Sequence, residues 1–78
     1  MTNLEKYTDV FASSLEIDKN VVEDAEYQKI EGWDSVGHMN LISNLEDAFD
    51  IMLDTDDILA FNSFKVGIEI LKKYDVDM

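Results

Sequence analysis

The chain contains no cysteine and no proline, and its six basic residues are all lysine, so arginine is absent too. Without cysteine, disulfide bonds, thiolate metal sites and thiol chemistry by the polypeptide itself are excluded. Apolar runs of membrane-spanning length are also missing, and the first residues lack the apolar segment of a secretory signal. We therefore expect a cytoplasmic protein that does not insert into membranes.

No repeat, low-complexity tract or glycine- and serine-rich linker divides the 78 residues. This length is enough for one small core but too short for a core plus a buried catalytic cavity of ordinary size. Hydrophobic residues make up 46% of the chain, as a folded domain requires. We expect a single domain over residues 1–78, monomeric and without catalytic activity of its own.

Acidic residues dominate the charge, because 18 aspartates and glutamates against six lysines give a formal net charge of −12. Such a surface repels nucleic acid and anionic lipid, which excludes nucleic acid as a partner and favours proteins with basic surfaces. Acids also have a simpler use, which is to keep a small domain in solution. Their clustering favours a partner, because no lysine lies between Lys29 and Lys65. Eight acids do: Glu31, Asp34, Glu46, Asp47, Asp50, Asp54, Asp56 and Asp57.

Helical spacing of apolar residues predicts a first helix over residues 3–15, with Asn3 as its N-cap. The apolar stripe of this helix consists of Leu4, Tyr7, Phe11 and Leu15, with Val10 beside it. From residue 16 to residue 33 neither a helical nor a strand period continues. We expect a long connection there, whose apolar side chains pack over the helices.

A second helix is predicted to begin at Asp34, which is a suitable N-cap residue. Its apolar positions recur every three or four residues, and they are Val36, Met39, Ile42, Leu45 and Phe49, widened by Leu41 and Ala48.

Two further helices follow. A short one is predicted over residues 55–61 with Thr55 as its cap, and Asp56 and Asp57 in its first turn suit the positive end of the helix dipole. Asn62 or Ser63 then caps a last helix, whose stripe is Phe64, Ile68, Leu71 and Tyr74. The chain is therefore expected to be all-α, a small up-and-down four-helix bundle with three main helices and one short helix.

The most informative stretch is residues 32–42, Gly-Trp-Asp-Ser-Val-Gly-His-Met-Asn-Leu-Ile. It resembles the attachment motif of acyl and peptidyl carrier proteins, in which Asp-Ser-Leu opens the second helix. Residues 45–51, Leu-Glu-Asp-Ala-Phe-Asp-Ile, are similar to the Leu-Glu-x-x-Phe end of that helix. The resemblance implies that Ser35 carries covalent 4′-phosphopantetheine from coenzyme A, and that the terminal thiol of that arm holds an acyl group as a thioester.

Physical chemistry supports the same residue. A hydroxyl at a helix N-terminus holds a phosphodiester close to unpaired N–H groups and the positive end of the dipole. No oriented base and no glycine-rich nucleophile elbow accompany Ser35, so a separate phosphopantetheinyl transferase must load it. Asp34 has two candidate roles, which are to help hold a divalent metal in the transferase complex or to cap the helix.

The motif departs from housekeeping fatty-acid carriers. Val36 replaces the usual leucine, and Gly37 and Asn40 stand where acids are common in those carriers. The resemblance is therefore closer to stand-alone carriers of specialised pathways, in fatty acid or polyketide biosynthesis. An aminoacyl or peptidyl carrier, using the same serine, and an unmodified acidic interaction module are the alternatives.

His38, the only histidine, lies one turn after Ser35. A Ser–His catalytic pair is disfavoured because no carboxylate is positioned to orient the imidazole, and a surface contact near the prosthetic arm is preferred. Trp33 is interpreted as a partly buried anchor for the long connection, with a contact to partner enzymes as the alternative.

Residues 54–57 begin like a calcium-binding loop, but Ile58, Leu59 and Lys65 stand where such a loop needs a ligand, a glycine and a glutamate. No specific metal site is predicted, although the dense acids of 46–57 are expected to attract magnesium or calcium. The resemblance implies that acyl-loading and acyl-accepting enzymes dock here through basic surfaces. The docking residues we expect are Val36, Glu46, Asp47, Asp54, Asp56 and Asp57.

Overall fold

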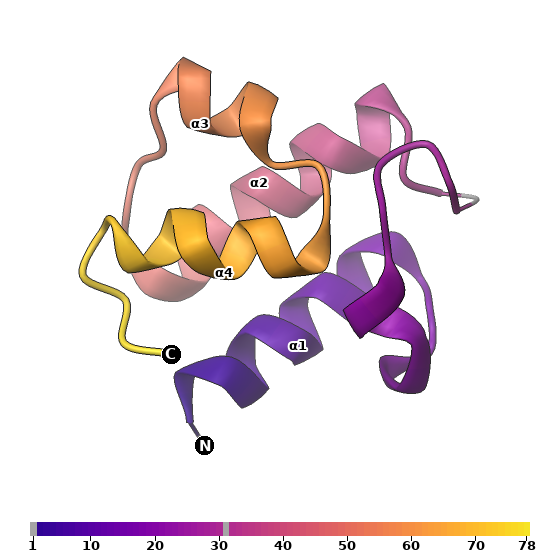
Figure 1. Cartoon of the computed structure of the whole chain (residues 1–78), viewed down its shortest axis with the longest axis horizontal. Coiled ribbons are helices and arrows are strands. Elements are labelled where there is room, and N and C mark those ends of the chain that lie inside the picture. Colours follow the sequence, from indigo (N-terminus) through magenta and orange to yellow (C-terminus); the bar gives the residue numbers. More distant parts are fainter. Residues whose placement is uncertain (1, 31) are drawn as a thin grey trace.

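The computed structural model describes residues 2–30 and 32–78, and these residues form an all-α bundle. Figure 1 shows the short α3 at the top, α2 behind α4, and the two termini at the same end of the molecule. The amide of Asn3 donates to the Asp77 carbonyl oxygen at 3.0 Å, which ties these ends together. The elements are α1 (Asn3–Leu15), the 3-10 helix η1 (Lys19–Asp24), α2 (Ser35–Phe49), α3 (Thr55–Ala60) and α4 (Phe64–Lys72).

Helix α1 has the predicted bounds, but its N-cap is Thr2 and not Asn3. The Thr2 hydroxyl accepts from the Glu5 N–H, and the Glu5 carboxylate accepts from the Thr2 N–H, which makes a capping box. Tyr7, Phe11 and Leu15 are buried as predicted. Leu4 is 41% exposed instead, because the first turn of the helix lies at the rim of the molecule.

The connection after α1 is ordered by contacts that the sequence pattern does not reveal. Residues 19–24 form η1, which was not predicted, and the Asp18 carboxylate caps it by accepting from the Asn20 N–H at 2.9 Å. Val22 and Ala25 are buried, which confirms that the apolar residues of this segment pack over the helices.

The last part of the connection pairs with the turn between α3 and α4. The Phe64 N–H donates to the Ala25 carbonyl at 3.1 Å, and the Tyr27 N–H donates to the Asn62 carbonyl at 2.8 Å. The Gln28 N–H then donates to the Trp33 carbonyl at 3.0 Å, which closes the loop just before α2. These bonds satisfy backbone groups of a segment that has no regular helix or strand.

The buried face of α2 differs from the predicted stripe. Leu41, Ile42 and Leu45 are buried, whereas Val36 and Met39 are 80% and 57% exposed. In the first turn the inward position is taken by His38, which has the same helical spacing to Leu41 and Leu45. Because the inward residue of this turn is polar, the apolar pattern predicted the wrong buried face for it.

The two later helices also shift slightly. Helix α3 ends at Ala60, and Asp54 precedes it as N-cap without a side-chain capping bond, so Thr55 is the first helical residue and not the cap. Of the two predicted caps for α4, Asn62 and Ser63, the structure has Ser63, whose hydroxyl accepts from the Val66 N–H at 3.0 Å. Of the helices within residues 2–30 and 32–78, none is long and apolar enough to cross a membrane.

Aromatic rings fill the core between α1, α4 and the connections. The Tyr7 ring lies 4.7 Å from that of Phe64 and 6.5 Å from that of Phe61, measured between centroids. The Tyr7 hydroxyl donates to the Phe64 carbonyl at 2.7 Å, and burial raises the pKa of this phenol. Close packing is possible because Gly67 in α4 has no side chain: a Cβ there would come within 2.2 Å of the Tyr7 hydroxyl.

Gly67→Ala should therefore destabilise the protein, although alanine usually stabilises a helix interior relative to glycine. The added methyl group forces Tyr7 and Phe61 to move, at a cost of about 1–3 kcal/mol in the free energy of unfolding. Urea titration followed by circular dichroism measures the change. Ser43→Ala, at an exposed position of α2, is the control and should leave stability nearly unchanged; a Gly67→Ala protein as stable as the wild type would contradict the packing described.

Candidate functional site

Ser35 is the first residue of α2 and its side chain is exposed. Asp34 caps the helix: its Oδ1 accepts from the Gly37 N–H at 2.9 Å, and its carbonyl accepts from the His38 N–H at 2.7 Å. The capping role predicted for Asp34 is thereby confirmed, and a metal-holding role stays a prediction. The first turn of α2 carries no acidic side chain, but the Asp34 carboxylate at the N-cap already interacts with the positive end of the helix dipole.

The backbone of the preceding loop lies directly against this turn. A Cβ on Gly37 would come within 1.9 Å of the Gly32 carbonyl oxygen, a distance that no side chain allows. Gly32 itself has a φ of 93°, in the region that favours glycine. The two glycines thus let the loop and the helix meet closely, which holds the segment before Ser35 against α2.

Tyr27 is a residue of this site that was not predicted from the sequence pattern. Its hydroxyl lies 3.4 Å from Ser35 Oγ, a long contact in which either oxygen can donate. Its half-buried ring lies 5.2 Å from the His38 ring and 6.0 Å from the Trp33 ring. Because Tyr27 belongs to an irregular segment, no periodic signal could have placed it beside the serine.

Trp33 and His38 are joined by a hydrogen bond beneath the site. The Trp33 side chain has no exposed surface, which confirms the anchor interpretation and excludes a direct contact with partner enzymes. Its Nε1–H donates to His38 Nδ1 at 3.0 Å, and His38 Nε2 lies 2.8 Å from the Ile58 carbonyl oxygen. His38 is half-buried, and both of its ring nitrogens have a hydrogen-bond partner. The predicted surface contact was wrong, and no Ser35–His38 pair is formed.

Exposed apolar side chains surround the serine. Val36 and Met39 lie on one face of α2, since residues three apart are neighbours on a helix. Leu59 in α3 is 76% exposed, and the bond from His38 to the Ile58 carbonyl holds this end of α3 against the first turn of α2. The end of the bundle that carries Ser35 is thus hydrophobic at several points.

The predicted acidic docking residues divide into two groups. Asp47, Asp54 and Asp56 are exposed, as a docking surface requires. The half-buried Glu46 is partly committed to the fold, because its carboxylate accepts from the Leu53 N–H at 2.8 Å. Asp57 is only 8% exposed and is left out of the docking surface.

The Asp57 carboxylate connects α3 to the end of α4. It accepts from the Lys73 ammonium and from the Tyr74 hydroxyl, both at 2.5 Å. Hydrogen bonding from Lys73, followed by that from Tyr74, holds the pKa of Asp57 below its usual value. A lysine distant in sequence therefore neutralises part of the acidic stretch. Within the described residues no three acidic or histidine side chains gather as metal ligands, so the expected attraction of magnesium to 46–57 has no preformed site there.

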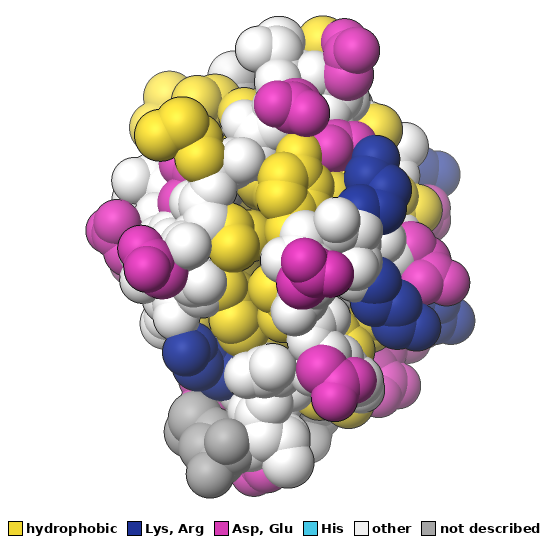
Figure 2. Space-filling model, turned by 90° about the vertical axis from the view of Figure 1, so that its left-hand side faces the viewer, with side chains coloured by type: hydrophobic (Ala, Val, Ile, Leu, Met, Phe, Trp, Pro, Cys, Tyr) yellow, Lys and Arg dark blue, Asp and Glu magenta, His cyan; other side chains and the backbone are white. Residues whose placement is uncertain are grey.

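Figure 2 shows the face of the molecule on the left of Figure 1, where several lysine side chains lie among acidic ones. There a strip of hydrophobic side chains reaches the surface between acidic and lysine side chains. The ammonium of Lys6 lies 4.8 Å from the centre of the Phe49 ring, and Lys72 pairs with Glu69 at 3.4 Å. Lys6 thus contacts the last residue of α2, whereas Ser35 is the first residue of that helix.

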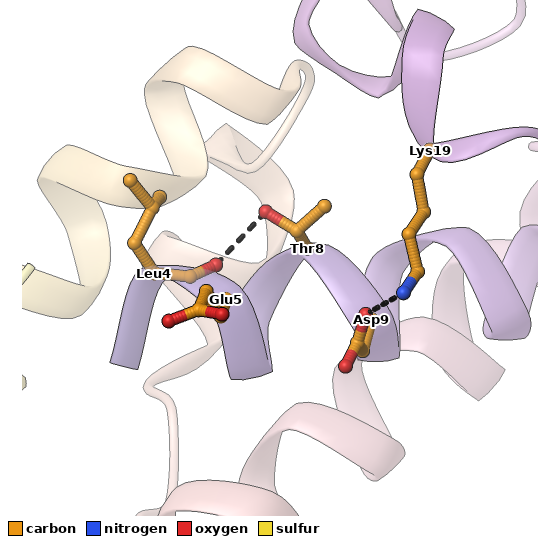
Figure 3. A pocket seen from close by; sticks show the side chains of 5 residues that line it. All are labelled: Leu4, Glu5, Thr8, Asp9 and Lys19. Atoms are coloured by element: carbon orange, nitrogen blue, oxygen red, sulfur yellow. Dashed lines mark hydrogen bonds and ion pairs between the residues drawn. The ribbon is translucent and has the colours of Figure 1, made fainter. Parts of the chain in front are cut away.

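A hollow on the outer face of α1 is separate from this site (Figure 3). Thr8 donates to the Leu4 carbonyl at 2.8 Å, and Asp9 pairs with Lys19 of η1. The Asp9 hydrogen bond raises the pKa of Lys19. The hollow, whose lining also includes Glu5, presents no nucleophile with a base and is not part of the proposed site.

Comparison with known proteins adds no assignment, since no family model, curated protein or solved structure matches this chain. The functional argument therefore depends on the residues themselves.

Asp57→Asn tests the link between α3 and α4 through pH. A folded-state pKa below the unfolded value means that ionised Asp57 stabilises the fold above the unfolded pKa of about 4, and that this contribution is lost as pH falls through the folded pKa. From about pH 5 to pH 2, the melting temperature of the wild type should therefore fall more steeply than that of Asp57→Asn. Asp56→Asn, at an exposed position, should follow the wild type; parallel curves for all three proteins would contradict the role of Asp57.

Proposed function

We propose that this protein is an acyl carrier, to which a phosphopantetheinyl transferase attaches 4′-phosphopantetheine through Ser35. The observation that carries the proposal is the exposed Ser35 hydroxyl at the first position of a well-capped, 15-residue helix. Together with the Asp-Ser motif and the acidic surface, this position supports a carrier more than any other class. The arm would supply a thiol that holds the acyl cargo as a thioester.

The position suits a phosphodiester for physical reasons. The N–H groups of a first helical turn point toward the N-terminus, and the helix dipole favours a negative group there. The Asp34 carboxylate takes up the Gly37 N–H and fixes where the helix begins. The remaining N–H groups of that turn and the helix dipole favour a phosphate on Ser35, and the neighbouring Asp34 carboxylate opposes it in part.

The chemistry of attachment belongs to the transferase. Ser35 Oγ forms a bond to phosphorus while the bond to the adenosine bisphosphate part of coenzyme A breaks, and the serine proton passes to a base. His38 cannot be that base in this geometry, because its Nδ1 accepts from Trp33 and its Nε2 contacts the Ile58 carbonyl. The base must be supplied by the transferase.

The surface around Ser35 supports docking of partner enzymes. Val36, Met39 and Leu59 offer apolar contacts beside the serine, while acids of α2 and α3 offer long-range attraction to basic surfaces. Buried apolar contacts supply most of the affinity in such interfaces, and exposed charges mainly steer the encounter. The partners that fit are the transferase and the acyl-loading and acyl-accepting enzymes.

The modification itself is the first test. Incubation with coenzyme A and a transferase should add one phosphopantetheine to the wild type and none to Ser35→Ala, as intact-mass spectrometry measures. Ser43→Ala, an exposed serine of the same helix, is the matched control and should be modified like the wild type. A wild type that resists several transferases, or a modified Ser35→Ala, would refute the carrier proposal and leave an acidic interaction module as the better description.

Charge reversal tests docking. Asp47→Lys should lower kcat/KM with the transferase about twofold to fivefold at low ionic strength, and the loss should shrink as salt is added, because exposed charge pairs are weak and screened. Glu23→Lys makes the same change of charge on η1 and is the control. Equal effects of the two variants would show that net charge alone is responsible and that α2 carries no docking surface.

A further inference from the structure

Three segments of the chain meet at the His38 ring. The Trp33 Nε1–H belongs to the loop before Ser35, His38 to the first turn of α2, and the Ile58 carbonyl to α3. The distances, 3.0 Å and 2.8 Å, are those of good hydrogen bonds. A single side chain thus joins the loop, the helix and α3 beside the serine.

We propose that His38 is a positioning residue for the modification of Ser35: as a neutral imidazole with its proton on Nε2, it holds the Trp33 loop and the end of α3 in place around the serine. This role depends on the proposed function, since it concerns attachment of the arm. It goes further by assigning the reaction a residue that does not touch the reacting atoms.

The tautomer follows from the partners. The indole N–H of Trp33 can only donate, so His38 Nδ1 must accept and carries no proton. A backbone carbonyl can only accept, so Nε2 must donate to Ile58 and carries the proton. The rings of Trp33 and His38 are nearly parallel, at 24°, which keeps the imidazole in this orientation.

Helix α3 needs such an attachment. It has only six residues, Asp57 is the only one of them that is buried, and Ile58 supplies one of the last four carbonyls that a helix leaves without an internal partner. The start of α3 is held by the residues just after α4, since the Asp54 N–H donates to the Tyr74 hydroxyl at 2.9 Å and Asp57 binds Lys73 and Tyr74. The bond to His38 is the corresponding attachment near its end.

The connection to Ser35 is short on both sides. Trp33 precedes the serine by two residues, and His38 follows it by three, so the bond between them spans the turn that carries the hydroxyl. Tyr27 packs on His38 with ring centroids 5.2 Å apart and reaches Ser35 Oγ with its hydroxyl. Losing the imidazole therefore releases both the loop and Tyr27 on the serine side.

Nuclear magnetic resonance of the unmodified protein tests the tautomer without any enzyme. Long-range ¹H–¹⁵N spectra distinguish a protonated ring nitrogen from an unprotonated one, and near neutral pH they should show Nε2 protonated and Nδ1 unprotonated. A predominant Nδ1–H tautomer would overturn the proposal, because neither hydrogen bond is then possible.

Three variants test the role in the reaction. His38→Leu removes both bonds and should lower kcat of modification about tenfold, the equivalent of one neutral hydrogen bond, with KM changed less than about twofold. His38→Gln keeps one acceptor and one donor and should restore most of the rate. Tyr74→Phe loosens the opposite end of α3 and should leave kcat unchanged.

Hydrogen exchange gives a second readout on the same variants. Amides at the end of α3, Leu59 to Phe61, should exchange about tenfold faster in His38→Leu and at the wild-type rate in His38→Gln. A His38→Leu protein with wild-type kcat, or a Tyr74→Phe protein equally impaired, would overturn the positioning role. A wild type that no transferase modifies overturns the proposed function and this role with it, whereas the tautomer and exchange results then still show whether the link exists.

Discussion

Burial of Trp33 is the constraint on which the rest of this structure depends. Its ring packs edge-on against Phe11 of α1 at 5.1 Å and lies 6.5 Å from Phe61, next to α4, while its indole N–H binds His38 of α2. One side chain therefore joins two helices and the turn after α3. In a chain of 78 residues the area available for burial is small, and a large aromatic side chain at the point where the segments meet contributes an unusual share of it.

The position of Ser35 follows from this arrangement. Trp33 cannot leave the core, Gly37 brings the Gly32 carbonyl against the helix, and Asp34 caps the first turn, so the backbone on both sides of the serine is held. The serine side chain nevertheless points to solvent. Under the proposed function, an exposed hydroxyl on a constrained backbone suits an external enzyme, because the enzyme can reach the oxygen without reorganising the protein.

The sequence predicted the helices better than their faces and ends. Periodicity located the four α-helices, and the capping preferences of Asp34 and Ser63 gave the correct starts of α2 and α4. Periodicity predicted the wrong buried face for the first turn of α2. Val36 and Met39 have helical spacing of their own, but the residue that points inward is His38. A helix of six residues such as η1 has too few positions to show a period at all.

The site was predictable only where it is local in sequence. The cap, the serine and the exposed acids lie within short segments, so their roles could be inferred from residue type and spacing. The contacts of Tyr27, the bond from His38 to Ile58 and the pairing of Asp57 with Lys73 join residues 8 to 20 positions apart, outside any repeating pattern. Such contacts are decided by how the helices pack, which no local propensity specifies.

Lysines pair with some of the acids and leave others exposed. Lys19 pairs with Asp9, Lys73 with Asp57, and Lys6 lies over the Phe49 ring, so these ammonium groups are already engaged within the fold. Asp47 and Asp56 stay exposed, and these acids of α2 and α3 have no lysine on their own helices. Under the proposed function, these exposed charges would act over about one Debye length and steer a basic partner toward α2 and α3 before the apolar contacts around Ser35 form.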